Sequence, residues 1–115
     1  MKTFLLTYHA PAEILKRSQD TSAEDAAAAA EKSMQEWKDW AARCGEQLID
    51  FGLPTTNGQA LHTNGSLSHS DKDIVGYSLI KANDLEEVSV LLKGHPHLSW
   101  NDACTIEIHE TMALP

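Results

Sequence analysis

Three stretches of the chain carry the hydrophobic pattern of β-strands. Residues 2–9 (KTFLLTYH) are apolar on both sides, which predicts a first strand with two buried faces. Residues 74–81 are rich in Ile, Val, Tyr and Leu and predict another strand. Residues 104–112 alternate, so that one set points one way (Cys104, Ile106, Ile108 and Met112) and the other set points the opposite way (Thr105, Glu107, His109 and Thr111).

A long amphipathic helix is predicted after residue 21. Its capping box is either Thr21 with Glu24 or Ser22 with Asp25, and a run of five alanines follows. Gly45 fits the C-cap. An apolar stripe at helical spacing, widened by Trp40, predicts that two tryptophans anchor this helix on the sheet; its members are Ala30, Met34, Trp37, Ala41 and Cys44.

A second helix is predicted between the last two strands. Asp84 and Glu87 form its capping box, and Gly94 is expected to end it. The segments between these elements are less regular: residues 13–20 are interpreted as a loop or short turn, and residues 46–54 as one helical turn or an extended arm. Residues 59–64 are predicted to form a short strand closed by an Asn-Gly turn, and residues 66–73 a polar connection.

The order of these elements is βαββαβ, typical of a ferredoxin-like α+β fold with two helices on one face of an antiparallel sheet. The other face would be left uncovered, and a first strand that is apolar on both sides disfavours exposing it to water. We therefore expect a homodimer in which a second copy packs on that face. The polar side of the last strand would then line an enclosed space for a small-molecule ligand.

Length and charge narrow the possible functions. A chain of 115 residues fits a single domain, residues 1–115. Its net charge of −8 disfavours nucleic acids and anionic membranes as partners. The opening apolar run is too short for a signal peptide, and no other segment is apolar enough to span a bilayer. Cys44 and Cys104 lack CxxC spacing and are expected to be reduced, as in a cytoplasmic protein.

The pentapeptide GHPHL at residues 94–98 places two imidazoles where the second helix is expected to stop. His95 could act as a general acid or base, with His97 as a ligand-binding neighbour. The alternative is structural, because a histidine near a helix end can bond free backbone groups. We expect neither metal nor cofactor: a third ligand from His62, Asp102 or His109 has no helical spacing to fix it.

A second group of candidates lies on the strands. Glu107 and His109 are two residues apart, so they share one face of the last strand, and a carboxylate can orient an imidazole for proton transfer. The alternative is a polar cross-strand pair at a sheet edge or dimer contact. Tyr8, His9 and Tyr77 could add ligand-binding groups to the same space.

The chain resembles the YCII-related, or DGPF-domain, family. The matching segments cover most of the chain: MKTFLLTYHAP, EWKDWAARCGEQLIDFGLP, IVGYSLIKANDLEEVSVLLKGHPHL and CTIEIHETMALP. The resemblance implies a dimeric α/β barrel of ferredoxin-like subunits. The resemblance also implies a catalytic pair, because members that look like lyases or hydrolases use a histidine in the first helix and an aspartate just before a proline at the end of the second helix. Here Met34 stands nearest the first position and His95 precedes Pro96, so that pair is absent.

Two functions remain open from the sequence. The first is a dimeric small-molecule-binding domain that could be an enzyme using His95, Glu107 and His109 for acid/base chemistry. The alternative is a non-catalytic interaction or regulatory module in which the histidines cap and pack. The missing histidine and aspartate pair favours the module, whereas the six histidines of the chain favour the binding domain.

Overall fold

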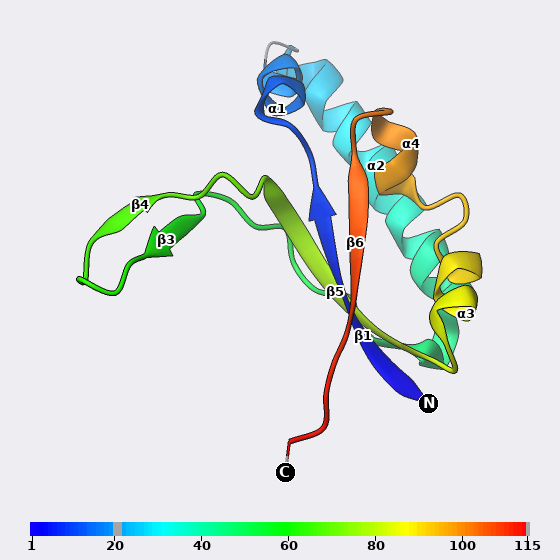
Figure 1. Ribbon diagram of the computed structural model, residues 1–115. Helices are drawn as coiled ribbons and strands as arrows, with labels where there is room; N and C mark the ends of the chain where they lie inside the picture. The colour runs from blue at the N-terminus through cyan, green and yellow to red at the C-terminus, as the bar shows by residue number, and fades with distance from the viewer. Residues whose placement is uncertain (20–21, 115) are drawn as a thin grey trace.

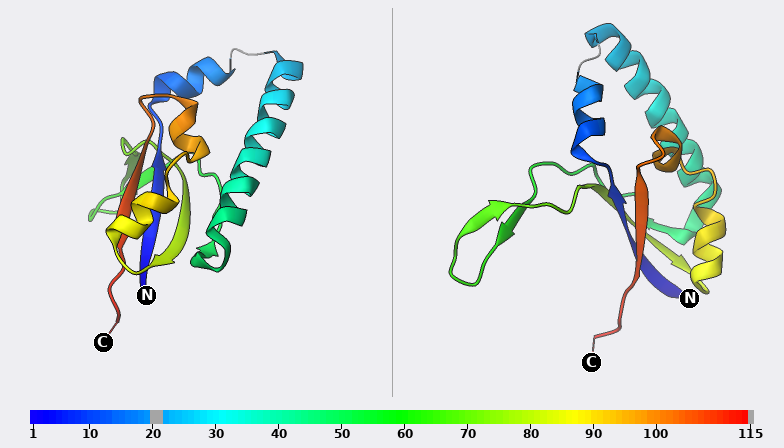
Figure 2. Two further views of the ribbon diagram at one scale, coloured as in Figure 1. Left: turned by 90° about the vertical axis from the view of Figure 1, so that its right-hand side faces the viewer. Right: turned by 45° about the horizontal axis from the view of Figure 1, so that its top comes forward.

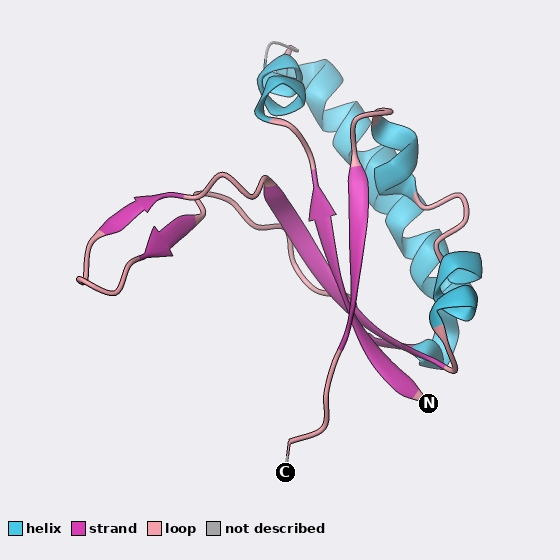
Figure 3. Ribbon diagram, viewed as in Figure 1, coloured by secondary structure: helices cyan, strands magenta, loops and turns pink. Residues whose placement is uncertain are grey.

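A four-stranded antiparallel sheet organises the chain. The computed structural model describes residues 1–19 and 22–114. The sheet has the strand order β2-β5-β1-β6, while β3 and β4 pair with each other in a separate hairpin (Figures 1 and 3). The strands are β1 (Lys2–His9), β2 (Leu48–Asp50), β3 (Gln59–Leu61), β4 (Leu67–His69), β5 (Ile74–Ala82) and β6 (Thr105–Glu110). The helices are α1 (Ala12–Gln19), α2 (Ala23–Cys44), the 3-10 turn η1 (Gly45–Gln47), α3 (Leu85–Leu91) and α4 (Pro96–Trp100).

Among the described residues, helices cover one face of the sheet and leave the other face bare. Figure 2 shows α2, α3 and α4 on the same side of the strands. On β1 the alternate residues Phe4, Leu6 and Tyr8 are buried against that layer, while the residues between them are only partly buried. We call the other side the open face, defined by Leu5, Thr7, His9, Tyr77, Leu79, Glu107 and His109. The architecture is α+β and is compatible with the ferredoxin-like arrangement that the sequence predicts.

The second strand of the sheet is not the one predicted. The sequence places it at residues 59–64, but β2 lies at Leu48–Asp50, in the run that is ambiguous between a helical turn and an extended arm. Residues 59–61 instead form β3 of the separate hairpin, and the predicted polar connection contains its partner β4. Both hairpin strands are too short for periodicity to identify their sheet.

The predicted helix starts are confirmed at two caps. The Ser22 hydroxyl accepts a hydrogen bond from the Asp25 N–H at 3.2 Å, while the alternative cap at Thr21 lies outside the described residues. The Asp84 carboxylate accepts one from the Glu87 N–H at 2.9 Å. Gly45 has a φ of +57°, which fits its predicted place at the end of α2.

Two helices were not predicted. Residues 12–19 form α1 rather than a loop. The expected helix stop also differs, because α3 ends at Leu91 and Pro96 begins a further helix, α4, instead of only interrupting the chain. Proline is well suited to a first helical position, since its missing N–H would have no partner there.

The apolar stripe of α2 is buried only near its C-terminal end. Trp40 and Cys44 are buried, but Met34 is 50% exposed and the alanine run is exposed. The two tryptophans do anchor the helix as predicted. The Trp37 ring packs edge-on against Tyr8 of β1 at 4.9 Å, and the Trp40 indole N–H donates to the Leu91 carbonyl at 3.0 Å.

Candidate functional site

Strand pairing gathers polar side chains on the open face. β1 lies between β5 and β6, and the register sets Thr7 opposite both Tyr77 and Glu107. Residues directly opposite each other in a sheet share a face, and so do residues two apart on one strand. His9 and His109 therefore lie on the same face as Glu107, and we call Thr7, His9, Glu107 and His109 the open-face cluster.

Glu107 is the centre of the open-face cluster. Its Oε1 atom lies 3.1 Å from His109 Nε2 and 3.7 Å from His9 Nε2, so one carboxylate oxygen stands between two imidazoles. The side chain of His9 is only 16% exposed, whereas those of Glu107 and His109 are each 57% exposed. The cluster is thus open to solvent on the His109 side and more enclosed at His9.

Hydrogen bonds fix the tautomer of His9. Its Nδ1 lies 2.8 Å from the Lys72 carbonyl oxygen, which can only accept, so Nδ1 carries the proton. In the neutral ring, Nε2 is then a lone-pair acceptor, and the Thr7 hydroxyl lies 2.8 Å from it. His9 is therefore oriented as a base, with the Glu107 carboxylate placed to stabilise an imidazolium.

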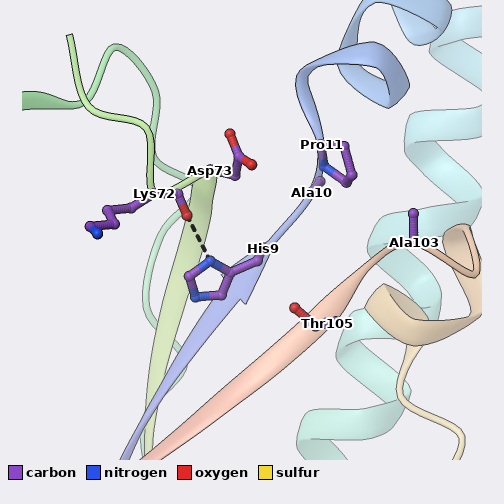
Figure 4. A pocket seen from close by; sticks show the side chains of 7 residues that line it. All are labelled: His9, Ala10, Pro11, Lys72, Asp73, Ala103 and Thr105. Atoms are coloured by element: carbon purple, nitrogen blue, oxygen red, sulfur yellow. Dashed lines mark hydrogen bonds between the residues drawn. The ribbon is translucent and has the colours of Figure 1, made fainter.

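A hollow adjoins the open-face cluster at the end of the sheet. It has a volume of about 220 Å³ and is open to solvent, and Figure 4 shows the side chains around it. The lining residues are His9, Ala10, Pro11, Lys72, Asp73, Ala103 and Thr105. His9 belongs both to this hollow and to the cluster, so the hollow and the cluster are adjacent.

His95 lies on the helix-covered side, away from the open-face cluster. The side chain is fully buried and caps α4, its Nδ1 accepting from the His97 N–H at 3.0 Å. The rings of Trp37 and Trp40 make T-shaped contacts with the imidazole, at centroid distances of 4.5 and 4.4 Å, and the Tyr8 ring stacks on it at 5.2 Å. Burial, together with the nearby charges of His97 and Arg43, lowers the pKa of His95 to about 3.

The proton on neutral His95 must sit on Nε2, because Nδ1 accepts a hydrogen bond. Nε2 is buried and has no hydrogen-bond partner among the described residues. The rings of Tyr8, Trp37 and Trp40 surround His95, and aromatic rings can accept weak N–H···π bonds. Within the described structure, His95 is a capping and packing residue.

His97 and Tyr8 also belong to the buried side. The His97 Nε2–H donates to the His9 carbonyl at 2.9 Å, and burial lowers the pKa of His97. The Tyr8 hydroxyl donates to Ser78 Oγ at 2.7 Å, and burial raises the pKa of Tyr8 to about 12. His97 therefore supports the backbone of His9 instead of joining its ring in a common pocket.

The predicted site residues thus separate into two groups. The open face brings together His9, Glu107 and His109, with Tyr77 on the same face, and the buried layer holds Tyr8, His95 and His97. Thr7 and the Lys72 carbonyl were not predicted. The spacing of Thr7 and His9, two residues apart on one strand, is the sequence signal that could have indicated Thr7.

The described residues were also compared with the requirements of a metal site, a reactive thiol and a membrane-spanning helix. Across residues 1–19 and 22–114, no three His, Cys, Asp or Glu side chains form a group that could hold a metal ion. Cys44 and Cys104 are buried free thiols whose pKa values are raised by burial, which disfavours the thiolate. No helix in the described ranges is long and apolar enough to cross a membrane.

Comparison with known proteins adds no relative to this picture. No protein-family model and no curated protein matches the chain. The chemistry of the open-face cluster therefore has to be argued from its own geometry.

Proposed function

We propose that the chain is a small-molecule-binding protein of the YCII-related family, active as a dimeric α/β barrel. Two ferredoxin-like subunits would pack sheet against sheet, and the open-face cluster would transfer protons to or from a small organic ligand. The observation that carries this proposal is the position of Glu107, with one oxygen between two imidazoles on a sheet face that no helix covers.

The exposed surface supports a dimer. The chain exposes 8294 Å², whereas a compact protein of 12.6 kDa exposes about 6,200 Å². Its radius of gyration is 15.8 Å, against about 13 Å for a compact domain of this length. The excess surface, about 2,000 Å², is what a subunit of an obligate homodimer commonly buries.

The chemistry follows from the state of His9. Nε2 of neutral His9, where the Thr7 hydroxyl lies at 2.8 Å, would take a proton from the ligand once that hydroxyl turns away. The Glu107 carboxylate would then face the imidazolium, while the Lys72 carbonyl holds the ring in place. Covering the face with a second sheet would exclude water and strengthen these electrostatic interactions. Leu5 and Leu79, opposite each other on the same face, would supply apolar contacts for the carbon skeleton of the ligand.

A ligand screen with matched variants tests this function. We expect a metabolite that raises the melting temperature of the parent to have little effect on Glu107→Gln or His9→Asn, because each removes part of the cluster. Glu110→Gln is the control, since it changes a neighbouring exposed carboxylate that instead pairs with Lys2 at 3.2 Å. A ligand that stabilises all four proteins equally would exclude the cluster from the binding site.

The alternative, a non-catalytic interaction module, is favoured by one observation. His95 is fully buried as a cap, so one of the three residues predicted to be catalytic has a structural role in the described chain. The same screen distinguishes the two functions, because a pure interaction module has no ligand whose binding depends on Glu107.

A further inference from the structure

We propose that the β3–β4 hairpin is an arm that grips a second copy of this chain and closes the open-face site of the dimer. The arm comprises residues 58–70. The inference rests on the proposed dimer, but it concerns a surface outside the sheet face. No role for this hairpin is required by the acid/base chemistry of the cluster.

The arm has no core of its own. Each of its strands has three residues, and the pair Leu61 and Leu67 lie opposite each other at 72% and 65% exposure. An isolated two-stranded hairpin is at best marginally stable in water. The polar groups of the arm are nevertheless well paired, for example His62 N–H to the Ser66 carbonyl at 2.8 Å and His62 Nε2 with Ser68 Oγ at 2.7 Å. The exposed leucine pair is the part that lacks a partner surface.

The direction of the arm points to the partner. Figures 1 and 2 show the hairpin leaving the sheet on the side opposite to the helices, which is the side of the open face. A second sheet stacked on that face would occupy the space beside the arm. Two arms related by a two-fold axis would then each flank the other subunit, as an isologous interface requires.

The base of the arm is connected to the candidate site. The Lys72 carbonyl accepts from His9 Nδ1, and the Ala10 N–H donates to the Asp73 carbonyl at 3.1 Å. Lys72 and Asp73 also line the hollow next to His9. Fixing the arm against a second copy would therefore also steady the wall of this hollow.

The lack of charge on the arm favours a second copy as its partner. Residues 51–70 contain no Asp, Glu, Lys or Arg, in a chain where 23% of residues are charged and the net charge is −8. Two acidic copies repel each other through their charged surfaces, but an uncharged arm can approach without that penalty. Charged residues are also depleted at interface cores. A polyanionic partner such as nucleic acid would instead require basic side chains on the arm.

The test is the dissociation constant of the dimer, measured by sedimentation velocity over a concentration series. We expect the double variant Leu61→Asp/Leu67→Asp to weaken the dimer by roughly 100-fold or more, since each dimer loses four buried leucines. The control is Leu85→Asp/Val90→Asp, which adds the same charge at positions 57% and 70% exposed on α3. It should change the dissociation constant by less than about threefold, because exposed charges are screened by salt.

A second arm variant separates loss of contact from added charge or misfolding. Leu61→Ser/Leu67→Ser introduces no charge and should also weaken the dimer, while the near-UV circular dichroism of the buried tryptophans stays that of the parent. A parent dimer whose dissociation constant is unchanged in both arm variants would overturn the arm's role and leave the proposed function standing. A parent that is monomeric at tens of micromolar would overturn the dimer itself, and the arm's role with it.

Discussion

Acidification should destabilise this protein through His95, and a variant can isolate the effect. The folded state holds the pKa of His95 at about 3, well below the ordinary value of 6.5 that it regains on unfolding. Between these two pH values the unfolded chain binds a proton that the folded chain does not. Stability is therefore complete above about pH 6.5 and falls as the pH is lowered toward 3.

The size of the effect follows from the same two values. From pH 7 to pH 5, the linkage of this one group costs about 2 kcal/mol of unfolding free energy, approaching about 1.4 kcal/mol for each further pH unit. His97 acts in the same direction, because its pKa is also lowered by burial. A domain of this size has a total stability of about 5–15 kcal/mol, so the loss is readily measurable.

The variant His95→Asn removes the titrating ring and keeps a side-chain acceptor for the cap of α4. It should be less stable than the parent at pH 7, because the aromatic layer loses a ring, but its stability should fall less steeply with acidification. The readout is the pH dependence of urea unfolding at fixed protein concentration.

The parent and His95→Asn should differ in how steeply the unfolding free energy changes with pH. We expect the parent and His95→Asn to differ by close to one bound proton between pH 6 and pH 4. Parallel pH profiles for the two proteins would show that the protonation of His95 does not oppose folding, and would refute the assignment of His95 as a neutral, buried cap.

Two further predictions concern the packing beneath the site, both measured by urea unfolding. Gly52→Ala should destabilise the fold by roughly 4 kcal/mol or more, because Gly52 has a φ of +79° and a Cβ there would also collide with the Tyr77 carbonyl. Gly45→Ala, at a φ of +57° and a ψ of −130° with open space around it, should cost only the backbone strain, about 1–3 kcal/mol. Equal losses would contradict the collision. Ser78→Ala should cost about 1–3 kcal/mol, because Ser78 Oγ accepts from the Tyr8 hydroxyl and donates to the Phe51 carbonyl at 2.6 Å. Ser89→Ala, which removes an exposed hydroxyl bonded within α3, is its control, and a Ser78 variant no less stable than this control would count against the buried network.

The strands with strong patterns could be predicted from the sequence, and the short ones could not. β1 and β5 follow from their β-rich composition, and α2 and α3 begin at caps visible as Ser-x-x-Asp and Asp-x-x-Glu. β2 has only three residues, too few to show a period, and its neighbours form a 3-10 turn. Its place in the sheet is decided by tertiary pairing with β5, which local pattern does not encode.

Part of the candidate site could be predicted from the alternation of side chains along the strands. Alternation along β6 places Glu107 and His109 together, and it also requires Tyr8 and His9 to face opposite sides of β1, so only one of them could join the cluster. Whether His9 or Tyr8 joins the cluster depends on which face of the sheet the helices cover, and the sequence does not specify this. The burial of His95 depends on the Trp37 and Trp40 rings that enclose it, a contact between segments far apart in sequence.

If a second copy covers the open face, the protein should have the mass of two chains in solution. Light scattering at micromolar concentration should give twice the 12.6 kDa of the chain for the parent. Leu5→Glu, which places a charge at the centre of that face between Leu79 and His109, should give the mass of a single chain. A parent protein with the mass of a single chain would show that no dimer forms. A Leu5→Glu protein that remains fully dimeric would show that the dimer does not form through the open face.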